Sequence, residues 1–307
     1  MVKNFWEGAG GDLSKKWAEL LFGPAFLFWL VTILLVTRPI GWDKVWDWLT
    51  AGDGFQQAAR LVAGLLLVSF SEYLVSRADF VVLRGLEGYW PSFLDTIAQW
   101  MIDFRKKRND RLESEWQLLR GKKRRKETLT RPERRKLATL EMKLHYIPAE
   151  QEDVMPTTLG NIIRTGEAMS EAKYGLDPMV CWARLWLVLP DAARTEISGV
   201  RSALNRLVSW WSWGLLSLVW VYWLPWLAVI SGVWLWLAYR LMLPVARNYA
   251  DLIEAAFDLF RWELYTHLHL PLPATSADEA QSGKDVTELL WRGPVGDSIT
   301  YVHPGKS

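Results

Sequence analysis

The stretch from Leu207 to Leu243 is almost entirely apolar and contains one charged residue, Arg240, near its end. An α-helix rises about 1.5 Å per residue, and about 20 apolar residues cross the hydrocarbon core of a bilayer once. The stretch is long enough for two crossings, and Pro225 stands near its middle. The sequence therefore predicts a hairpin of two transmembrane helices over residues 207–243.

Two earlier blocks have the same character. Leu20 to Thr37 follows the cations Lys15 and Lys16, and no small-residue cleavage pattern follows it, which is typical of a retained signal-anchor helix. Ala58 to Val75 forms the second block. We therefore expect a cytoplasmic N-terminus over residues 1–19 and two transmembrane helices within residues 20–78.

The whole chain has 307 residues, of which 50% are hydrophobic and 21 are tryptophan. Its mean hydropathy is nevertheless only +0.01, because the apolar blocks alternate with strongly charged ones. The predicted fold is an all-α integral membrane protein with four transmembrane helices and a cytoplasmic helical domain over residues 79–206. The single cysteine, Cys181, excludes an intrachain disulfide and a cysteine metal cluster.

The distribution of charge predicts the orientation. Between Arg105 and Lys143 there are 16 lysines and arginines against 6 acidic residues. Loops rich in lysine and arginine next to membrane spans stay on the cytoplasmic side. With two spans before this loop and two after it, both termini are predicted to be cytoplasmic.

This loop is predicted to form a basic hairpin over residues 92–146. Its first helix, Ser92 to Arg120, has apolar residues at helical spacing: Phe93, Ile97, Met101 and Phe104. Its second helix, Pro132 to Tyr146, begins with Thr130 and Glu133 at capping-box spacing. The basic tip is a solvated face that sets topology, or it binds an anionic lipid or an acidic protein. Nucleic acid is the least supported partner, because neither aromatic interleaving nor a nucleic-acid fold accompanies the tip.

Glu72 is an ionisable residue inside the second apolar block. Such a residue is a functional-site candidate. It lies close to the polar end of the block, however, so it reaches the headgroups or pairs with Arg77, or else it belongs to an ion pathway. Glu72 and Arg77 are therefore the candidate ionisable pair of the membrane segment.

The sub-membrane segment over residues 156–190 mixes apolar residues with glycines and charges. Its candidate ligand or coupling residues are Asn161, Arg164, Glu167, Tyr174, Asp177 and Arg184. The charged members predict either an internal ion-pair network or a pocket for a small anionic ligand. Met179 to Leu189 is too short to span a bilayer and is expected to be interfacial or buried in protein.

The same segment carries three short patterns: P-T-x-L-G-N-x-x-R-x-x-E from Pro156, Y-G-x-D from Tyr174, and W-x-R-L-W-x-x-L-P from Trp182. In these patterns the chain resembles a group of bacterial multi-pass membrane proteins of unknown function. The resemblance covers residues 156–273. It implies a multi-pass protein of the bacterial inner membrane and no particular activity.

The C-terminal part is predicted to leave the membrane. A helix from Asp191 continues into the third span, and residues 244–270 form a cytoplasmic amphipathic helix. The apolar stripe of that helix packs on its own subunit or seals a homo-oligomer. Residues 271–307 are expected to be a polar tail with partial order at best.

The sequence offers no phosphate-binding glycine loop, nucleophile elbow or H-E-x-x-H motif, so we expect no enzyme and no cofactor. His267 and His269 are two residues apart, which places them on different faces of a helix and argues against a metal site. Three functions remain open: a homo-oligomeric channel gated by its cytoplasmic domain, a non-conducting scaffold that tethers a partner through the basic hairpin, and, with least support, a lipid enzyme.

Overall fold

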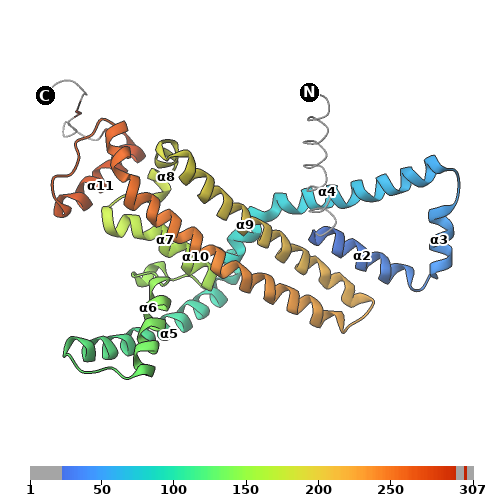
Figure 1. Cartoon of the computed structure of the whole chain (residues 1–307), viewed down its shortest axis with the longest axis horizontal. Helices are drawn as coiled ribbons and strands as arrows, with labels where there is room; N and C mark the ends of the chain where they lie inside the picture. Colours follow the sequence, from blue (N-terminus) through green and yellow to red (C-terminus); the bar gives the residue numbers. More distant parts are fainter. Residues whose placement is uncertain (1–22, 295–300, 303–307) are drawn as a thin grey trace. The chain divides into compact units, whose positions relative to one another are not determined.

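The computed structural model describes residues 23–294 and 301–302 (Figure 1). Every regular element in these residues is a helix, so the predicted all-α class is confirmed. The N-terminal segment 1–19 and the first residues of the first apolar block lie outside the described residues.

The chain forms two compact units. The first unit comprises Met1–Leu83 and Asn205–Leu241, and the second comprises Arg84–Leu204 and Met242–Ser307. Three helices contribute residues to both units: α4 (Gly54–Glu87), α9 (Asp191–Leu216) and α10 (Leu227–His267).

The first unit begins with α2 (Pro24–Thr37) and α3 (Trp42–Thr50). Pro24 is tolerated in the first turn of α2, where the backbone N–H would lack an intrahelical partner in any case. The helices pack around Ala25, Val68 and Trp213, which are almost fully buried. These apolar contacts join α2, α4 and the end of α9.

Two helical segments of the described chain, Gly54–Arg124 and Leu227–His267, contain a window long and apolar enough to cross a membrane. The pair α2 and α3 meets the same criterion only when taken together, and it bends by 117° at the break. The described residues therefore show two or at most three candidate spans, not the four predicted. The helix α9 ends at Leu216, where the 3₁₀ helix η3 (Ser217–Tyr222) begins, so only residues 207–216 of the third apolar run belong to it.

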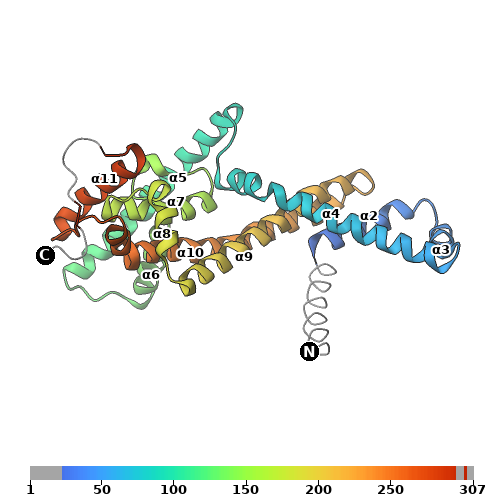
Figure 2. The ribbon, with the colours of Figure 1, turned by 90° about the horizontal axis from the view of Figure 1, so that it is seen from above.

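The predicted hairpin of residues 207–243 is built from the end of α9, the 3₁₀ helix η3 (Ser217–Tyr222) and the start of α10. The Ser217 and Ser231 hydroxyl oxygens are 2.8 Å apart, and Gly214 lies against the Trp234 indole, as expected for antiparallel segments. Figures 1 and 2 show α9 and α10 side by side up to the turn that joins them. The chain thus reverses near Pro225.

In the second unit, η1 (Ser92–Leu94) leads into α5 (Asp95–Arg124), which packs against α6 (Arg131–His145). Ion pairs from Lys122 to Glu133 and from Lys136 to Glu115 show that the two helices are antiparallel. Glu133 also accepts hydrogen bonds from the backbone N–H and the hydroxyl of Thr130, each 2.9 Å long. Helices thus lie where the sequence predicts the basic hairpin.

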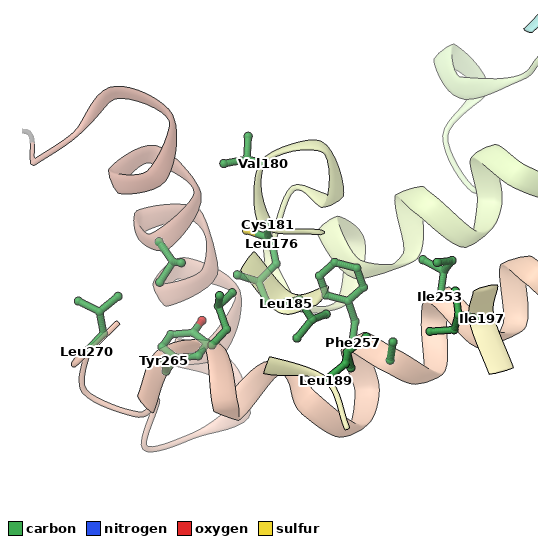
Figure 3. Packing of buried hydrophobic residues seen from close by; sticks show 13 residues of the cluster. Leu176, Val180, Cys181, Leu185, Leu189, Ile197, Ile253, Phe257, Tyr265 and Leu270 are labelled. Atoms are coloured by element: carbon green, nitrogen blue, oxygen red, sulfur yellow. The ribbon is translucent and has the colours of Figure 1, made fainter. Parts of the chain in front are cut away.

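The core of the second unit is formed by α8 (Pro178–Val188), the start of α9, the end of α10 and α11 (Ser276–Arg292), next to η2 (Gln151–Asp153) and α7 (Thr158–Tyr174). Figure 3 shows how Leu176, Leu185, Phe257 and Tyr265 converge there. Cys181 is also fully buried in this cluster.

The structure adds one finding about the C-terminal part and corrects one prediction. No break separates the fourth apolar run from the amphipathic segment 244–270, because α10 continues through Pro244. Proline removes one helical hydrogen bond, and the burial of the adjacent Met242, Leu243 and Ala246 offsets this loss. The segment 271–307 is also more than a polar tail with partial order, since it contains α11. Residues Glu279, Gly283 and Val286 of α11 are buried at helical spacing.

Candidate functional site

In the first unit, Glu72 lies half-buried on α4 and faces α9. Its carboxylate accepts a 3.0 Å hydrogen bond from the Ser209 hydroxyl and a 2.7 Å hydrogen bond from the Trp213 indole N–H. Both donors belong to the apolar part of α9. The carboxylate therefore links α4, a candidate span, to the end of α9.

Arg77, the predicted partner of Glu72, points elsewhere. Its guanidinium donates to the Tyr73 hydroxyl at 2.6 Å and lies 4.8 Å from the centroid of the Tyr73 ring. The described residues contain no ion pair between Glu72 and Arg77. The structure thus separates the two members of the candidate pair and gives Glu72 neutral partners.

Two further pairs of side chains in this unit bond across helices. The Trp29 indole donates to the Ser71 hydroxyl at 3.0 Å, and the Trp220 indole donates to the Thr32 hydroxyl at 2.9 Å. Such bonds stabilise helix packing modestly in a membrane. Three tryptophans, Trp29, Trp213 and Trp220, are therefore hydrogen-bond donors between helices of the first unit. The sequence offered no signal for these pairings, because they join residues far apart in the chain.

In the second unit, Asn161 is nearly buried on α7 and supports the loop before that helix. Its side-chain oxygen accepts from the Met155 N–H at 2.8 Å, and its amide donates to the Met155 and Thr157 carbonyls at 3.1 and 3.0 Å. All its hydrogen bonds therefore serve the local backbone.

Arg164 pairs with Asp153 of η2. Its Nε and Nη2 atoms donate to the same Asp153 oxygen at 2.9 and 2.6 Å. The Asp153 carboxylate raises the pKa of Arg164, although the burial of the guanidinium acts in the opposite direction. Sequence reasoning missed Asp153 because it lies just outside the segment that carries the patterns.

Tyr174 belongs to a polar cluster between α7 and α10. Its hydroxyl donates to Asp258 at 2.6 Å, and Lys173 donates to Glu254 at 2.6 Å and to Asp258 at 3.3 Å. The Arg261 guanidinium lies over the Tyr174 ring, 4.1 Å from its centroid. This cluster fastens the C-terminal end of α7 to α10.

Asp177 is the N-cap of α8, and Arg184 lies within that helix. The Asp177 carboxylate accepts from the Met179 N–H at 2.8 Å and so caps the helix, while Arg184 donates to the Val180 carbonyl of its own helix at 2.8 Å. The described residues contain no ion pair among Arg164, Glu167, Asp177 and Arg184. These four residues therefore do not form a joint ion-pair network.

Glu167 differs from the other candidates, because its carboxylate has no hydrogen bond among the described residues. Burial raises its pKa, an effect that Arg164, Arg84 and Arg201 oppose. Glu167 lines a cavity of about 220 Å³ between α7, α8 and α10. The other lining residues are mostly apolar: Ile163, Gly166, Pro178, Met179, Trp182, Ala183, Tyr249, Ala250 and Ile253. Without a lysine or arginine in its lining, the cavity suits an apolar ligand with a positive charge or a hydrogen-bond donor better than a small anion.

No group of three or more His, Cys, Asp or Glu side chains in the described part of the chain is placed to hold a metal ion. Comparisons with protein-family models, with curated proteins and with solved structures find no match for this chain. The structure by itself defines an all-helical protein with candidate membrane-spanning helices and two separate candidate sites, Glu72 and the cavity beside Glu167.

Proposed function

We propose that the protein is a homo-oligomeric channel or pore-like effector of a membrane, gated by its second unit. The observation that carries the proposal is the Glu72 carboxylate, which lies in an apolar helix and bonds to Ser209 and Trp213. An acidic side chain at the centre of a membrane helix costs about 3 kcal/mol on insertion scales, and such residues mark ion or proton pathways.

In this proposal α2, α4, the end of α9 with η3, and the start of α10 cross the membrane as four spans. The excess of lysine and arginine between Arg105 and Lys143 supports a cytoplasmic second unit and cytoplasmic termini. The resemblance over residues 156–273 supports the inner membrane of a bacterium. No catalytic role, metal or cofactor is part of the proposal.

The proposed channel is closed at rest. Glu72 and several serine, threonine and tryptophan side chains of the first unit bond to each other across helices, while others such as Ser69 bond to their own helix. A hydrated path therefore requires rearrangement or assembly between copies. Only 6% of the most apolar window of the segment Gly54–Arg124 is buried within the chain. Most of that surface is therefore available to lipid or to neighbouring copies.

The cavity beside Glu167 is the proposed place for a gating ligand. It lies between α7, α8 and α10, and α10 continues into the first unit as one helix. A ligand that changes the packing of α7 on α10 would act on a helix shared by both units. The lining favours an apolar amine over an anion.

Recordings from planar bilayers that contain the purified protein test the proposal. With an apolar amine added to open the channel, we expect cation currents in the wild type and a marked loss of conductance in Glu72→Gln, because the variant keeps the side-chain shape and loses the charge. Arg77→Gln is the matched control, since Arg77 lies on the same helix without contacting Glu72. Absence of conductance in the wild type at every voltage, pH and amine concentration would exclude a channel.

The scaffold function is supported by a different observation. At the tip of the basic hairpin, Lys123, Arg124 and Arg131 are exposed and make no ion pair with any described residue. These free cations favour an acidic partner. Neutralising all three with glutamine should abolish recovery of an acidic protein partner in a pull-down. Lys136→Gln is the control, because Lys136 is already paired with Glu115. Unchanged recovery after neutralisation would exclude tethering through the tip.

A further inference from the structure

An apolar stripe runs along the outer face of η1 and the first half of α5. Its members are spaced i, i+4, i+7 and i+11, which places them on one side of a helix: Phe93, Ile97, Trp100 and Phe104. Their exposed fractions are 80%, 51%, 68% and 61%. The Trp100 and Phe104 rings stack on each other with centroids 6.2 Å apart. Four large apolar side chains are thus presented together, with nothing from the described chain over them.

Other side chains of α5 contact the rest of the second unit, and these contacts fix the rotation of the helix about its axis. Arg105 donates from Nε to the Pro156 carbonyl at 2.6 Å and from Nη1 to the Thr158 hydroxyl at 3.1 Å. The helix α6 packs on α5 and buries its own Leu137 and Leu140. The apolar stripe therefore cannot turn inward without breaking both contacts.

A basic turn follows the stripe on the same face. Lys107, Arg108 and Arg111 lie three, four and seven residues after Phe104, and all three are exposed. None of them forms an ion pair with a described residue. Large apolar side chains gathered on one side of a helix, with free cations in the next turns, suit a helix that binds at a membrane surface. There the rings enter the boundary of the acyl chains and the cations meet anionic headgroups.

We propose that the apolar stripe and the basic turn of α5 bind the surface of an anionic lipid bilayer. A bilayer is the favoured occupant because α4, a candidate span, ends at Glu87, only a few residues before η1 begins at Ser92. Such a short connection gives the face a high effective concentration at the membrane. The free cations add charge complementarity to anionic headgroups. This role does not depend on whether the protein conducts ions.

Site-specific labelling of the full-length protein in liposomes tests the proposal. The only native cysteine is first removed as Cys181→Ala, and Ile97→Cys then carries an environment-sensitive fluorophore. Asp110→Cys is the matched control, because Asp110 is exposed on α5 but lies off the stripe. The label is quenched with brominated lipid or with iodide in water, in liposomes of phosphatidylcholine alone and in liposomes that also contain phosphatidylglycerol.

We expect brominated lipid to quench the label at residue 97 in the anionic liposomes, and iodide to quench the label at residue 110. Replacing the basic turn by three glutamates should reduce lipid quenching at residue 97 to the level of residue 110. Iodide quenching of residue 97 in both lipid mixtures would overturn the proposal. Protection of residue 97 from both quenchers would also overturn it, because that result indicates a protein partner or a second copy on the stripe.

Discussion

Arg261 of α10 and Glu279 of α11 form an ion pair in which Nε lies 2.6 Å from Oε1, and their side chains are only 13% and 11% exposed. The guanidinium also lies over the rings of Tyr174 and Trp262. A pair this far from water is sensitive to the loss of one partner, because the other charge then remains buried and uncompensated. The pair helps to hold α11 in the second unit.

Glu279→Ala should lower the free energy of unfolding by about 3 kcal/mol, the lower end of the range for breaking a buried pair. Chemical denaturation of the protein in detergent, followed by circular dichroism, measures the change. The double variant Arg261→Met, Glu279→Leu should be less destabilised than the sum of the single variants. Strict additivity would show that the two charges do not depend on each other.

The close contact between α7 and α10 requires a glycine at residue 166 of α7. A Cβ at residue 166 would lie 2.7 Å from both Cα and Cβ of Ala250, whose backbone cannot easily move. Gly166→Ala should therefore destabilise the protein by about 1–3 kcal/mol, as expected for overpacking. Gly199→Ala is the control, because a Cβ there meets nothing within 4 Å. The control should be neutral or stabilising by up to about 1 kcal/mol, since alanine favours a helix. Equal stability of the two variants would contradict this account of α7 packing.

Glu167 should make stability depend on pH. Burial raises its pKa in the folded protein above the ordinary value of 4.5, whereas the unfolded chain keeps that ordinary value. Between the two values the folded state binds more protons, so the free energy of unfolding falls as pH rises through this window. Thermal unfolding measured from pH 4 to pH 8 should show a smaller decline for Glu167→Gln than for the wild type. Glu171→Gln, on the exposed side of α7, should retain the wild-type decline; a flattened decline in this control would assign the effect to another group.

Cys181 should be unreactive in the native protein. It is fully buried, and this burial raises the pKa of its thiol to about 11. At pH 8 only about one thiol in a thousand is then ionised, and the thiolate is the reactive form. Iodoacetamide should leave the native protein unmodified by mass spectrometry and should alkylate it after denaturation. The exposed thiol of Asp110→Cys is the positive control, and rapid native alkylation of Cys181 would show that the core around α8 opens.

Local patterns predicted much of the fold. Some features depend only on residues that are close together in the chain, so the sequence alone is enough to predict them. These features are the apolar runs, the turn near Pro225 and the capping pair Thr130 and Glu133. The number of candidate spans was overestimated because the third apolar run is divided between α9 and the 3₁₀ helix η3, and because α2 meets the criterion only together with α3. That one helix, α10, joins the fourth apolar run to the amphipathic segment 244–270 through Pro244 emerges only from the structure.

The sequence by itself determined the helical class, the apolar blocks and the excess of positive charge that separates them. Only the tertiary structure decided which polar groups meet. Glu72 bonds to Ser209 and Trp213, and Arg261 bonds to Glu279. The partners lie on different helices, so the spacing of residues within one helix does not predict these bonds. The physical reason is that helix periodicity specifies which face of a segment is buried, whereas the partner of that face depends on how distant segments pack.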